Sequence, residues 1–346
     1  MKKIRLAILG YGNVPNAVLR YMEEGAAQQA LKAADIEFVI TGVTTGSRGN
    51  AIDESGISLQ KLEAVGKEGK ISDLNKGPAT KDNLEFIAQV PADILFVATP
   101  ASVPSLEEIK AAMKRNMSVA TSNKTPVANH FRELTKLAKE FGVQFRFGAT
   151  VLAGYPPWGQ YFESVTRPEI SELEIVVNAT SNNILTMMLE RGWSFEQGVA
   201  EAQRLGIAER DPSDDVDGHD TQKKLAIIAN VLMGADLTPD DIPTKGIRDI
   251  TLEQLKKADQ EGKWIQLMGR AWKDDSSQVK AEVKPVEVGN PFFVGIRQTS
   301  MGIYFQTPAA DFGIRLNLKE GQRAIMATAA GVFEDLLTIA RRLPNA

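Results

Sequence analysis

The segment IRLAILGYGNVPNAVLRYM, residues Ile4 to Met22, determines how the first part of the chain folds. A continuous apolar run leads into Gly10-Tyr11-Gly12 and then into apolar residues at helical spacing, which predicts a buried parallel strand, a tight turn and a helix. In such a unit Gly10 permits the sharp turn, and Gly12 lets backbone N–H groups approach a pyrophosphate at the helix N-terminus. We therefore expect a dinucleotide to contact four residues of this turn: Gly10, Gly12, Asn13 and Val14.

The glycine pattern is incomplete, because Pro15 occupies the third position of G-x-G-x-x-G. Proline is tolerated in the first helical turn, since the N–H that it lacks would have no helical partner there. It does not allow the close strand–helix contact that glycine permits. Because Gly-x-Gly alone is a common pattern, an ordinary strand–turn–helix is the alternative interpretation.

The second predicted strand, Ile36 to Thr45, leads directly into Gly46-Ser47-Arg48-Gly49. NAD sites usually place an acidic residue at the end of this strand to bind the ribose diol, whereas an arginine accommodates the 2′-phosphate of NADP. The first acid after the strand is Asp53, so Arg48 favours NADP over NAD as the cofactor. A loop arginine in contact with water only is the alternative.

Two further predicted strands end in polar residues. The strand at residues 92–100 ends in Thr99-Pro100, and the strand within MSVATSNKTPV, residues 117–127, ends in Ser122-Asn123-Lys124. The carboxyl ends of parallel strands face the ligand crevice in open α/β folds, so these residues are candidate contacts of the cofactor or substrate. Strands and helices alternate over residues 1 to about 150, which predicts a doubly wound parallel sheet of the Rossmann type.

The composition of the 346 residues is that of a globular protein, with 43% hydrophobic and 24% charged residues. The net charge of -4 argues against nucleic acid or an anionic membrane as the main partner. The chain has no cysteine, which excludes disulfides and thiolate chemistry and fits a reducing cytoplasm, and it has only two histidines. No apolar run approaches the roughly 18 residues of a membrane span, so we expect a soluble cytoplasmic protein.

From about residue 145 the pattern changes to strands in which apolar and polar residues alternate. Such strands recur at residues 170–177, 276–288, 302–308 and 312–318, which predicts a second, mixed or antiparallel sheet. We expect a polar turn at Asn178–Asn183, followed by a helix, and a long amphipathic helix at residues 324–343. The predicted dinucleotide-binding domain spans residues 1–130 and 319–346, and the second, α+β domain spans residues 131–318.

The stretch AERDPSDDVDGHDTQKKLAIIANVL, Ala208 to Leu232, places many acids before an apolar helix. Asp220 and Lys224 are four residues apart and share one helical face, and Asp217 lies one turn earlier on nearly the same face. With Glu209 they suggest a carboxylate-lined pocket that suits a small zwitterionic substrate, because the acids bind its ammonium and the lysine donates a proton to a nascent alkoxide. A solvated loop before an acid-rich first helical turn is the alternative.

The same stretch resembles the signature region of homoserine dehydrogenases. In that family Glu-x-Asp-Pro is followed by Asp-Asp and then by Gly-x-Asp-x-x-x-Lys-Leu, and the match runs without gaps from Glu209 to Leu225. Shorter matches follow the family order: Gly10-Tyr11-Gly12, Ser122-Asn123-Lys124, GATVLAGYP (148–156), NATSNNIL (178–185) and TAAGVFEDLLTIAR (328–341). The resemblance covers essentially the whole chain, without the C-terminal regulatory domain that some members carry.

This resemblance implies a reversible hydride transfer between NAD(P)H and aspartate semialdehyde, giving homoserine. It implies that Lys124 and Lys224 are the acid–base and carbonyl-polarising pair, and that Thr180 helps to seat the substrate carboxylate. Three acids are expected to hold the substrate's amino and hydroxyl groups: Glu209, Asp215 and Asp220.

The resemblance also implies features outside the catalytic set. Gly321 is what is left of a glycine-rich run that lies near the nicotinamide in the family, so it is a candidate cofactor contact. A homodimer through the second sheet is expected, which makes residues 131–318 the catalytic and dimerisation domain. Backbone carbonyls are expected to bind a monovalent cation, Na⁺ or K⁺, at four positions: Gly148, Val151, Ala153 and Tyr155.

Several residues depart from the family pattern. Ala179 replaces a glycine and Asn183 a tyrosine in the substrate turn, Gly148 stands where a glutamate is usual, and EGQRAIMA (320–327) replaces most of the glycine-rich run. These departures leave two alternatives open. The chain either applies the same chemistry to another small amino or hydroxy acid, or is a nucleotide-binding homologue without turnover.

Overall fold

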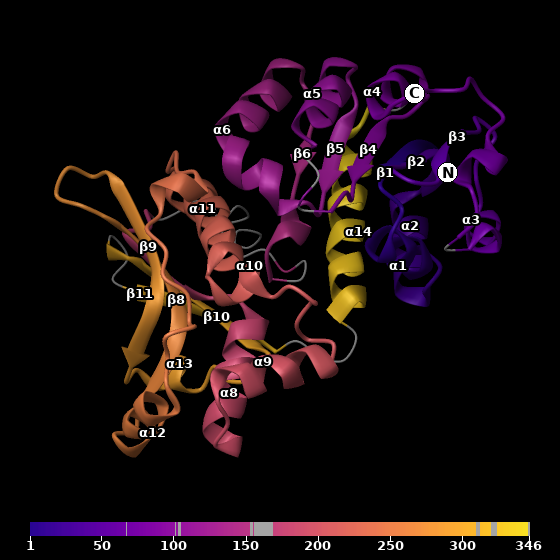
Figure 1. Cartoon of the computed structure of the whole chain (residues 1–346). Coiled ribbons are helices and arrows are strands. Elements are labelled where there is room, and N and C mark those ends of the chain that lie inside the picture. The colour runs from indigo at the N-terminus through magenta and orange to yellow at the C-terminus, as the bar shows by residue number, and fades with distance from the viewer. Residues whose placement is uncertain are drawn as a thin grey trace. The chain divides into compact units, whose positions relative to one another are not determined.

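The structure, a computed structural model, describes residues 1–66, 68–100, 102, 105–152, 155, 169–308, 312–319 and 324–344. The chain forms two compact units, Met1–Tyr155 with Arg323–Ala346, and Pro156–Gln322 (Figure 1). The boundary predicted after residue 130 falls inside helix α6 (Lys124–Glu140), which is bent at His130 and belongs entirely to the first unit.

The first unit is built on a six-stranded sheet with the order β3-β2-β1-β4-β5-β6. Five of the strands run parallel to one another, in the order β2, β1, β4, β5 and β6. The remaining strand, β3, lies at the edge and is antiparallel to β2. This confirms the predicted doubly wound sheet. The strands are β1 (Lys2–Leu9), β2 (Ile36–Thr45), β3 (Gly49–Ile52), β4 (Ile94–Val97), β5 (Ser118–Thr121) and β6 (Phe145–Arg146).

Strand β3 is a departure from the expected run of parallel strands. The chain reverses after Thr45, so that residues Gly49 to Ile52 pair with Thr45 to Gly42 in antiparallel register. A strand of four residues is too short for an alternating pattern to be visible in the sequence. The consequence is that Arg48 lies in the turn of a hairpin.

Helices cover both faces of this sheet. One apolar core joins alternate residues of β1, such as Ile4, Leu6 and Ile8, to α1, α2, α3 and α14, and the other joins Ala7 and Leu9 to α4, α5 and α6. The helices are α1 (Asn13–Met22), α2 (Gly25–Ala34), α3 (Leu59–Val65), α4 (Asn83–Gln89), α5 (Leu106–Lys114), α6 and α14 (Ala324–Arg342), with short 3-10 turns at Ile71–Leu74 and Gly148–Thr150.

Helix α14 returns from the far end of the sequence to complete the first unit, and it confirms the predicted C-terminal helix. It packs along α1, where the rings of Tyr21 and Phe333 meet edge to face at 5.5 Å. It also anchors the segment after β6, because the Gly148 N–H donates to Asp335 Oδ2 at 2.7 Å. Burial raises the pKa of the Asp335 carboxyl to about 7.

The second unit contains a five-stranded sheet with the order β11-β10-β7-β8-β9, in which every pair is antiparallel. It confirms the predicted α+β domain. One of its strands, β8, was not predicted, because its first six residues are all buried and show no polar alternation. The strands are β7 (Glu172–Val176), β8 (Trp264–Lys273), β9 (Val279–Val288), β10 (Ser300–Thr307) and β11 (Phe312–Lys319).

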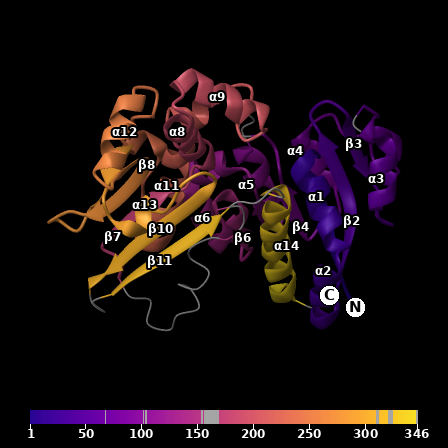
Figure 2. The ribbon, with the colours of Figure 1, turned by 90° about the horizontal axis from the view of Figure 1, so that it is seen from below.

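Helices α8 and α11 of the second unit pack against one face of this sheet, and α9 packs against α8 (Figure 2). Gly269 of β8 marks that face, because a Cβ atom there would lie 2.8 Å from Ile175 and 3.3 Å from Leu225 of α11. No helix among the described residues is long and apolar enough to span a membrane. The helices are α8 (Ala179–Arg191), α9 (Phe195–Arg204), α10 (Ser213–Val216), α11 (His219–Met233), α12 (Leu252–Gln260) and α13 (Pro291–Val294), with a 3-10 turn at Pro239–Asp241.

Candidate active site

The polar cluster of the second unit starts where β7 meets α8. Helix α8 begins at Ala179, so the polar turn expected at Asn178–Asn183 is wrong: those residues already form the first turns of the helix. Asn178 is the N-cap, and its Oδ1 accepts a hydrogen bond from the Ser181 N–H at 2.7 Å. Asparagine is among the preferred N-cap residues because its side-chain oxygen satisfies one of the free N–H groups of the first turn.

The acid-rich stretch forms two helices with a break at Gly218. This glycine has φ +89°, in the left-handed region, and separates α10 from α11. Asp217 therefore does not share a face with Asp220, and the expectation that it would is wrong. Asp217 ends α10 and pairs with Arg248, whose Nη2 lies 2.9 Å from Asp217 Oδ2.

Asp220 and Lys224 lie one turn apart on α11 and form an ion pair, with 2.7 Å between Lys224 Nζ and Asp220 Oδ2. Only 3% of the Asp220 side chain and 15% of the Lys224 side chain is exposed. Lys224 Nζ also donates to the carbonyl oxygen of Val177 at 2.7 Å. The ammonium group is thus held by one carboxylate and by the end of strand β7.

Asp215 joins the same cluster from α10. Its Oδ1 accepts a hydrogen bond from Asn178 Nδ2 at 2.6 Å, and the Thr180 hydroxyl lies against the same carboxyl. Burial raises the pKa of Asp215, and the nearby Asp220 charge raises it further, while Asn178 and Lys224 lower it. The structure therefore brings four of the predicted residues together: Thr180, Asp215, Asp220 and Lys224.

Glu209 is placed differently from the other predicted acids. It is exposed in the turn between α9 and α10, where Gln203 Nε2 donates to its backbone oxygen at 3.2 Å. Among the described residues, no side-chain hydrogen bond or ion pair joins Glu209 to the cluster around Asp220.

In the first unit, Gly10 and Gly12 differ in what surrounds them. Gly10 has φ +90°, and a Cβ atom there would lie 2.8 Å from the backbone oxygen of Ala98, so only glycine fits. Gly12 precedes α1, and a Cβ atom there would meet no atom within 4 Å. The open space at Gly12 adjoins the N-terminal N–H groups of α1, which is the arrangement that binds a pyrophosphate.

A pocket of about 610 Å³ lies beside this turn. Its wall includes three predicted residues, Gly12, Asn13 and Arg48. Arg48 donates to the backbone oxygens of Tyr11 at 2.5 Å and Gly66 at 2.8 Å, and its guanidinium lies 5.8 Å from the centre of the Tyr11 ring. Arg48 therefore bonds to the protein at the wall of the pocket, which disagrees with the alternative of a loop arginine in contact with water only.

The ends of β4 and β5 carry a second polar network. Asn123 Nδ2 donates to Thr99 Oγ1 at 3.0 Å, to Ser105 Oγ at 3.2 Å and to the Pro100 carbonyl oxygen at 3.3 Å. Asn123 also caps α6 by accepting a hydrogen bond from the Thr125 N–H at 3.1 Å. The network places Thr99, Pro100 and Asn123 together beside Lys124, the first residue of α6.

For the remaining residues predicted to bind the cofactor or a cation, the structure shows fewer contacts. Val14 is half-buried against the core, and the N–H of Ser122 donates to Val97 O at 3.1 Å. Gly321 and Ala153 lie outside the described residues.

Around the predicted cation loop, Leu152 has φ +47° and accepts a hydrogen bond from the Tyr155 N–H at 3.0 Å, so the chain turns sharply there. Within the described ranges, no group of three or more His, Cys, Asp or Glu side chains could hold a metal ion.

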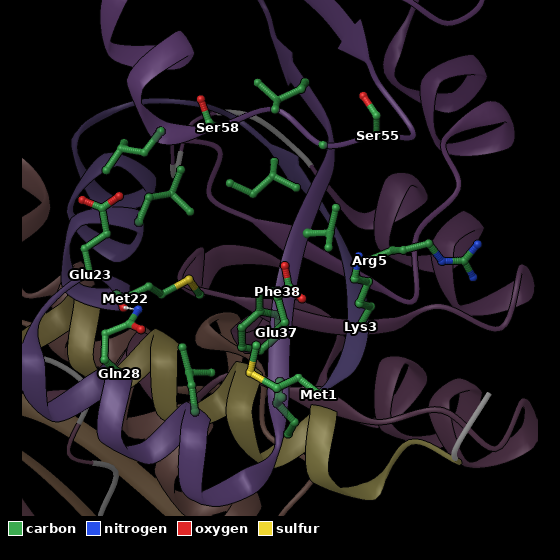
Figure 3. A pocket seen from close by; sticks show the side chains of 18 of the residues that line it. Met1, Lys3, Arg5, Met22, Glu23, Gln28, Glu37, Phe38, Ser55 and Ser58 are labelled. Carbon is green, nitrogen blue, oxygen red and sulfur yellow. Dashed lines mark hydrogen bonds between the residues drawn. The ribbon is translucent and has the colours of Figure 1, made fainter.

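A larger hollow of about 1210 Å³ lies elsewhere in the first unit (Figure 3). Its walls include Met1, Lys3 and Arg5 from the start of β1 and Glu37 and Phe38 from the start of β2. These are the amino ends of parallel strands, whereas ligands of open α/β sheets bind at the carboxyl ends. None of the predicted site residues lines this hollow, so it is not the candidate active site.

Three residues of the site were not among those predicted from the sequence. Asn178 holds two of the acids, Ser105 completes the network at Thr99, and the backbone of Tyr11 holds Arg48. Asn178 carried one local signal, since asparagine is a preferred N-cap residue between a strand and a helix. The contacts of Ser105 and Tyr11 depend on distant segments and leave no local pattern.

Comparison with known proteins gives a consistent result. The family model described as homoserine dehydrogenase matches residues 160–337. The chain is 32% identical to the homoserine dehydrogenase of Methanocaldococcus jannaschii, covering 96% of this chain and 98% of that protein. It is 33% identical to the NAD(+)-dependent homoserine dehydrogenase of Pseudomonas canavaninivorans, covering 84% and 83% respectively.

A solved structure of a hyperthermophilic archaeal homoserine dehydrogenase in complex with NADPH resembles this fold, with a TM-score of 0.80. The two chains are 27% identical, and the similarity covers 99% of each. The fold and the sequence motifs therefore point to the same family of proteins.

The two glycines provide a test of where a dinucleotide binds. We predict that Gly10→Ala lowers the melting temperature, because the left-handed backbone and the clash with Ala98 together cost about 2 kcal/mol or more. We predict that Gly12→Ala leaves the melting temperature nearly unchanged but weakens dinucleotide binding, because its methyl group fills the open space at the helix N-terminus. Thermal unfolding and fluorescence titration with NADPH measure the two effects. Unchanged NADPH binding in Gly12→Ala would show that the pyrophosphate lies elsewhere.

Proposed function

Because this chain belongs to the homoserine dehydrogenase family of NAD(P)-dependent oxidoreductases, we propose that it interconverts aspartate semialdehyde and homoserine. The observation that carries this proposal is the cluster in which Asp215, Asp220 and Lys224 meet at the end of β7. A binding protein without turnover has no evident need of a nearly buried lysine paired with an acid, since burying such a pair is costly.

The acids suit the ammonium group of the amino-acid substrate. Asp215 and Asp220 present carboxylates from α10 and α11, and Glu209 is proposed to complete the set from its exposed turn. Thr180, at the start of α8, is proposed to donate its hydroxyl to the substrate carboxylate, where the nearby N–H groups of the helix also favour an anion. This arrangement orients the aldehyde carbon without any covalent bond to the protein.

Lys124 and Lys224 are proposed to act on the substrate oxygen. In the direction of reduction, the aldehyde carbon gains a hydride and the carbonyl electron pair moves to oxygen. Lys224, which is paired with Asp220, then gives a proton to that oxygen, and Lys124 polarises the same carbonyl. In the direction of oxidation the proton returns to lysine. The protein therefore has to supply orientation and one proton.

The nicotinamide cofactor supplies the hydride, and the residues of the first unit fit its binding. The open space at Gly12, the start of α1 and the pocket beside Arg48 are proposed to take the adenosine and pyrophosphate groups. We propose NADP as the preferred cofactor, because Arg48 faces the pocket with a charge suited to a 2′-phosphate. Val14, Thr99, Pro100, Ser122, Asn123 and Gly321 are proposed as further contacts.

Two more proposals follow from family membership. The backbone oxygens of Gly148, Val151, Ala153 and Tyr155 are proposed to bind Na⁺ or K⁺ at the sharp turn around Leu152. The sheet of the second unit is proposed to form a homodimer through the face away from its helices. Trp272 and Tyr304 are half-buried on that face, and aromatic side chains are frequent in such interfaces.

The substrate is tested by measuring reduced-nicotinamide absorbance with homoserine and a panel of small hydroxy acids. We expect NADP⁺ reduction with homoserine at a higher kcat/KM than with the other acids. Turnover of another acid but not of homoserine would show that the substrate is that acid and that the proposed hydride transfer is correct. Cofactor binding without turnover of any acid would contradict the proposed activity.

Two neighbouring lysines provide a matched test of the proton donor. Lys224→Ala is expected to lower kcat by about 10² to 10⁴-fold, the usual range for a general acid, with little change in NADPH binding. Lys223→Ala, the control, removes the adjacent lysine, which pairs with the more exposed Asp214, and should change kcat less than about twofold. If NADPH affinity collapsed in Lys224→Ala, the proposed place of Lys224 in the reaction would be wrong.

The choice of cofactor is tested at Arg48. Arg48→Ala is expected to weaken NADPH binding by about 10- to 100-fold, as loss of charged hydrogen bonds does, while NADH binding changes much less. Arg20→Ala is the control, because Arg20 lines the same pocket but is paired with Glu63 at 2.7 Å. An equal loss of NADPH and NADH affinity in Arg48→Ala would mean that Arg48 only supports the loop.

A further inference from the structure

One amide group lies at the centre of the polar cluster in the second unit. Both hydrogen bonds donated by Asn178 Nδ2 go to carboxylates, to Asp215 Oδ1 at 2.6 Å and to Asp220 Oδ2 at 2.8 Å. The amide oxygen accepts from the Ser181 N–H at 2.7 Å. Asn178 is 3% exposed, so these partners replace water almost completely.

The orientation of this amide is fixed by its partners. If the oxygen and nitrogen were exchanged, the NH₂ group would face the Ser181 N–H and the oxygen would face two carboxylates. Every contact would then be repulsive or unsatisfied. The side chain of Asn178 therefore has one orientation, and it presents its two N–H groups to the two acids.

The Asn178 amide offsets the repulsion between the two carboxylates of the cluster. Asp215 and Asp220 meet the same nitrogen atom, so their charges are close together, and like charges at short range oppose ionisation. Lys224 offsets the charge of Asp220 directly, through their ion pair. Each hydrogen bond from Asn178 favours the charged form of the acid that accepts it.

The backbone next to Asn178 fixes the third group of the cluster. Val177, the preceding residue, accepts the hydrogen bond of Lys224 Nζ through its carbonyl oxygen at 2.7 Å. Two consecutive residues at the junction of β7 and α8 therefore set the positions of both acids and of the lysine. These contacts come from segments 37 to 47 residues apart in the chain.

We propose that Asn178 is a positioning residue of the active site, which holds the carboxyl groups of Asp215 and Asp220 side by side for the substrate's ammonium group. This inference rests on the proposed function for the identity of the ligand, an amino acid with a free ammonium. The residue acts through the two acids and need not touch the substrate.

Two substitutions separate this role from helix capping. Asn178→Ser and Asn178→Asp both retain an oxygen that can cap α8, because serine and aspartate are also preferred N-caps. Neither can donate two hydrogen bonds to the two acids, and aspartate adds a third negative charge. Asn230→Ala is the control: Asn230 is another buried asparagine of this unit, and its side chain bonds to Leu237 O and Leu237 N at 2.8 Å each instead of to the acids.

We expect KM for homoserine to rise about 10-fold or more in both Asn178 variants, because a misplaced binding group commonly costs this much. The acid limb of the pH profile of kcat/KM should move to higher pH. In wild type the hydrogen bond from Asn178 lowers the pKa of Asp215, and the charged groups that face Asp215 are Asp220 and Lys224. Without the amide, Asp215 stays protonated to a higher pH. Asn230→Ala should lower the melting temperature and leave the acid limb of the kcat/KM profile at the wild-type pH.

A measurement without substrate keeps this test separate from the proposed function. The carboxyl ¹³C shift of Asp215, assigned with Asp215→Asn, reports its titration in the free protein. A higher titration midpoint in Asn178→Ser than in wild type supports the inference even if homoserine is not turned over. An unchanged midpoint, or an unchanged KM and acid limb in an active enzyme, would show that Asn178 only caps the helix.

Discussion

The ion pair between Asp220 and Lys224 is the interaction on which the polar cluster of the second unit depends. A carboxylate and an ammonium that are almost buried lose most of their hydration, and the pair is stable only when other hydrogen bonds replace that water. Here Val177 and Asn178 provide those bonds from the junction of β7 and α8. The end of a strand, rather than the acid-rich loop, therefore holds the charged groups in the interior, and the acids before α11 are more than a solvated helix start.

The sequence was informative for most features that depend on neighbouring residues. The first strand, the glycine turn and α1 follow from one continuous pattern, and the four-residue spacing of Asp220 and Lys224 suffices to pair them. Features that depend on distant segments were missed. The first six residues of β8 lack alternation because all of them are buried, and the role of Asn178 depends on acids 37 and 42 residues further along the chain. The break at Gly218 was missed although it is local, because a glycine among acids does not by itself show a left-handed backbone.

The choice of nicotinamide cofactor is proposed to depend on the hairpin of β2 and β3. Because β3 returns antiparallel to β2, Arg48 lies in a short turn, and two backbone carbonyls hold its guanidinium at the pocket wall. Relatives of this chain include an NAD(+)-dependent enzyme and an enzyme solved in complex with NADPH, so both kinds of nicotinamide cofactor occur with members of the family. A turn of a few residues can change without disturbing the parallel strands, which makes it a suitable place for such variation.

The first unit is assembled from both ends of the chain, and this has a consequence for synthesis on the ribosome. Its core includes Ala329, Val332, Phe333 and Leu336 of α14, which pack with the apolar side chains of β1 and α1. The second unit is continuous, so all of its residues emerge before α14 does. The nascent N-terminal segment must therefore keep an uncovered apolar face until α14 has been synthesised, a state in which exposed apolar surface favours chaperone binding and aggregation.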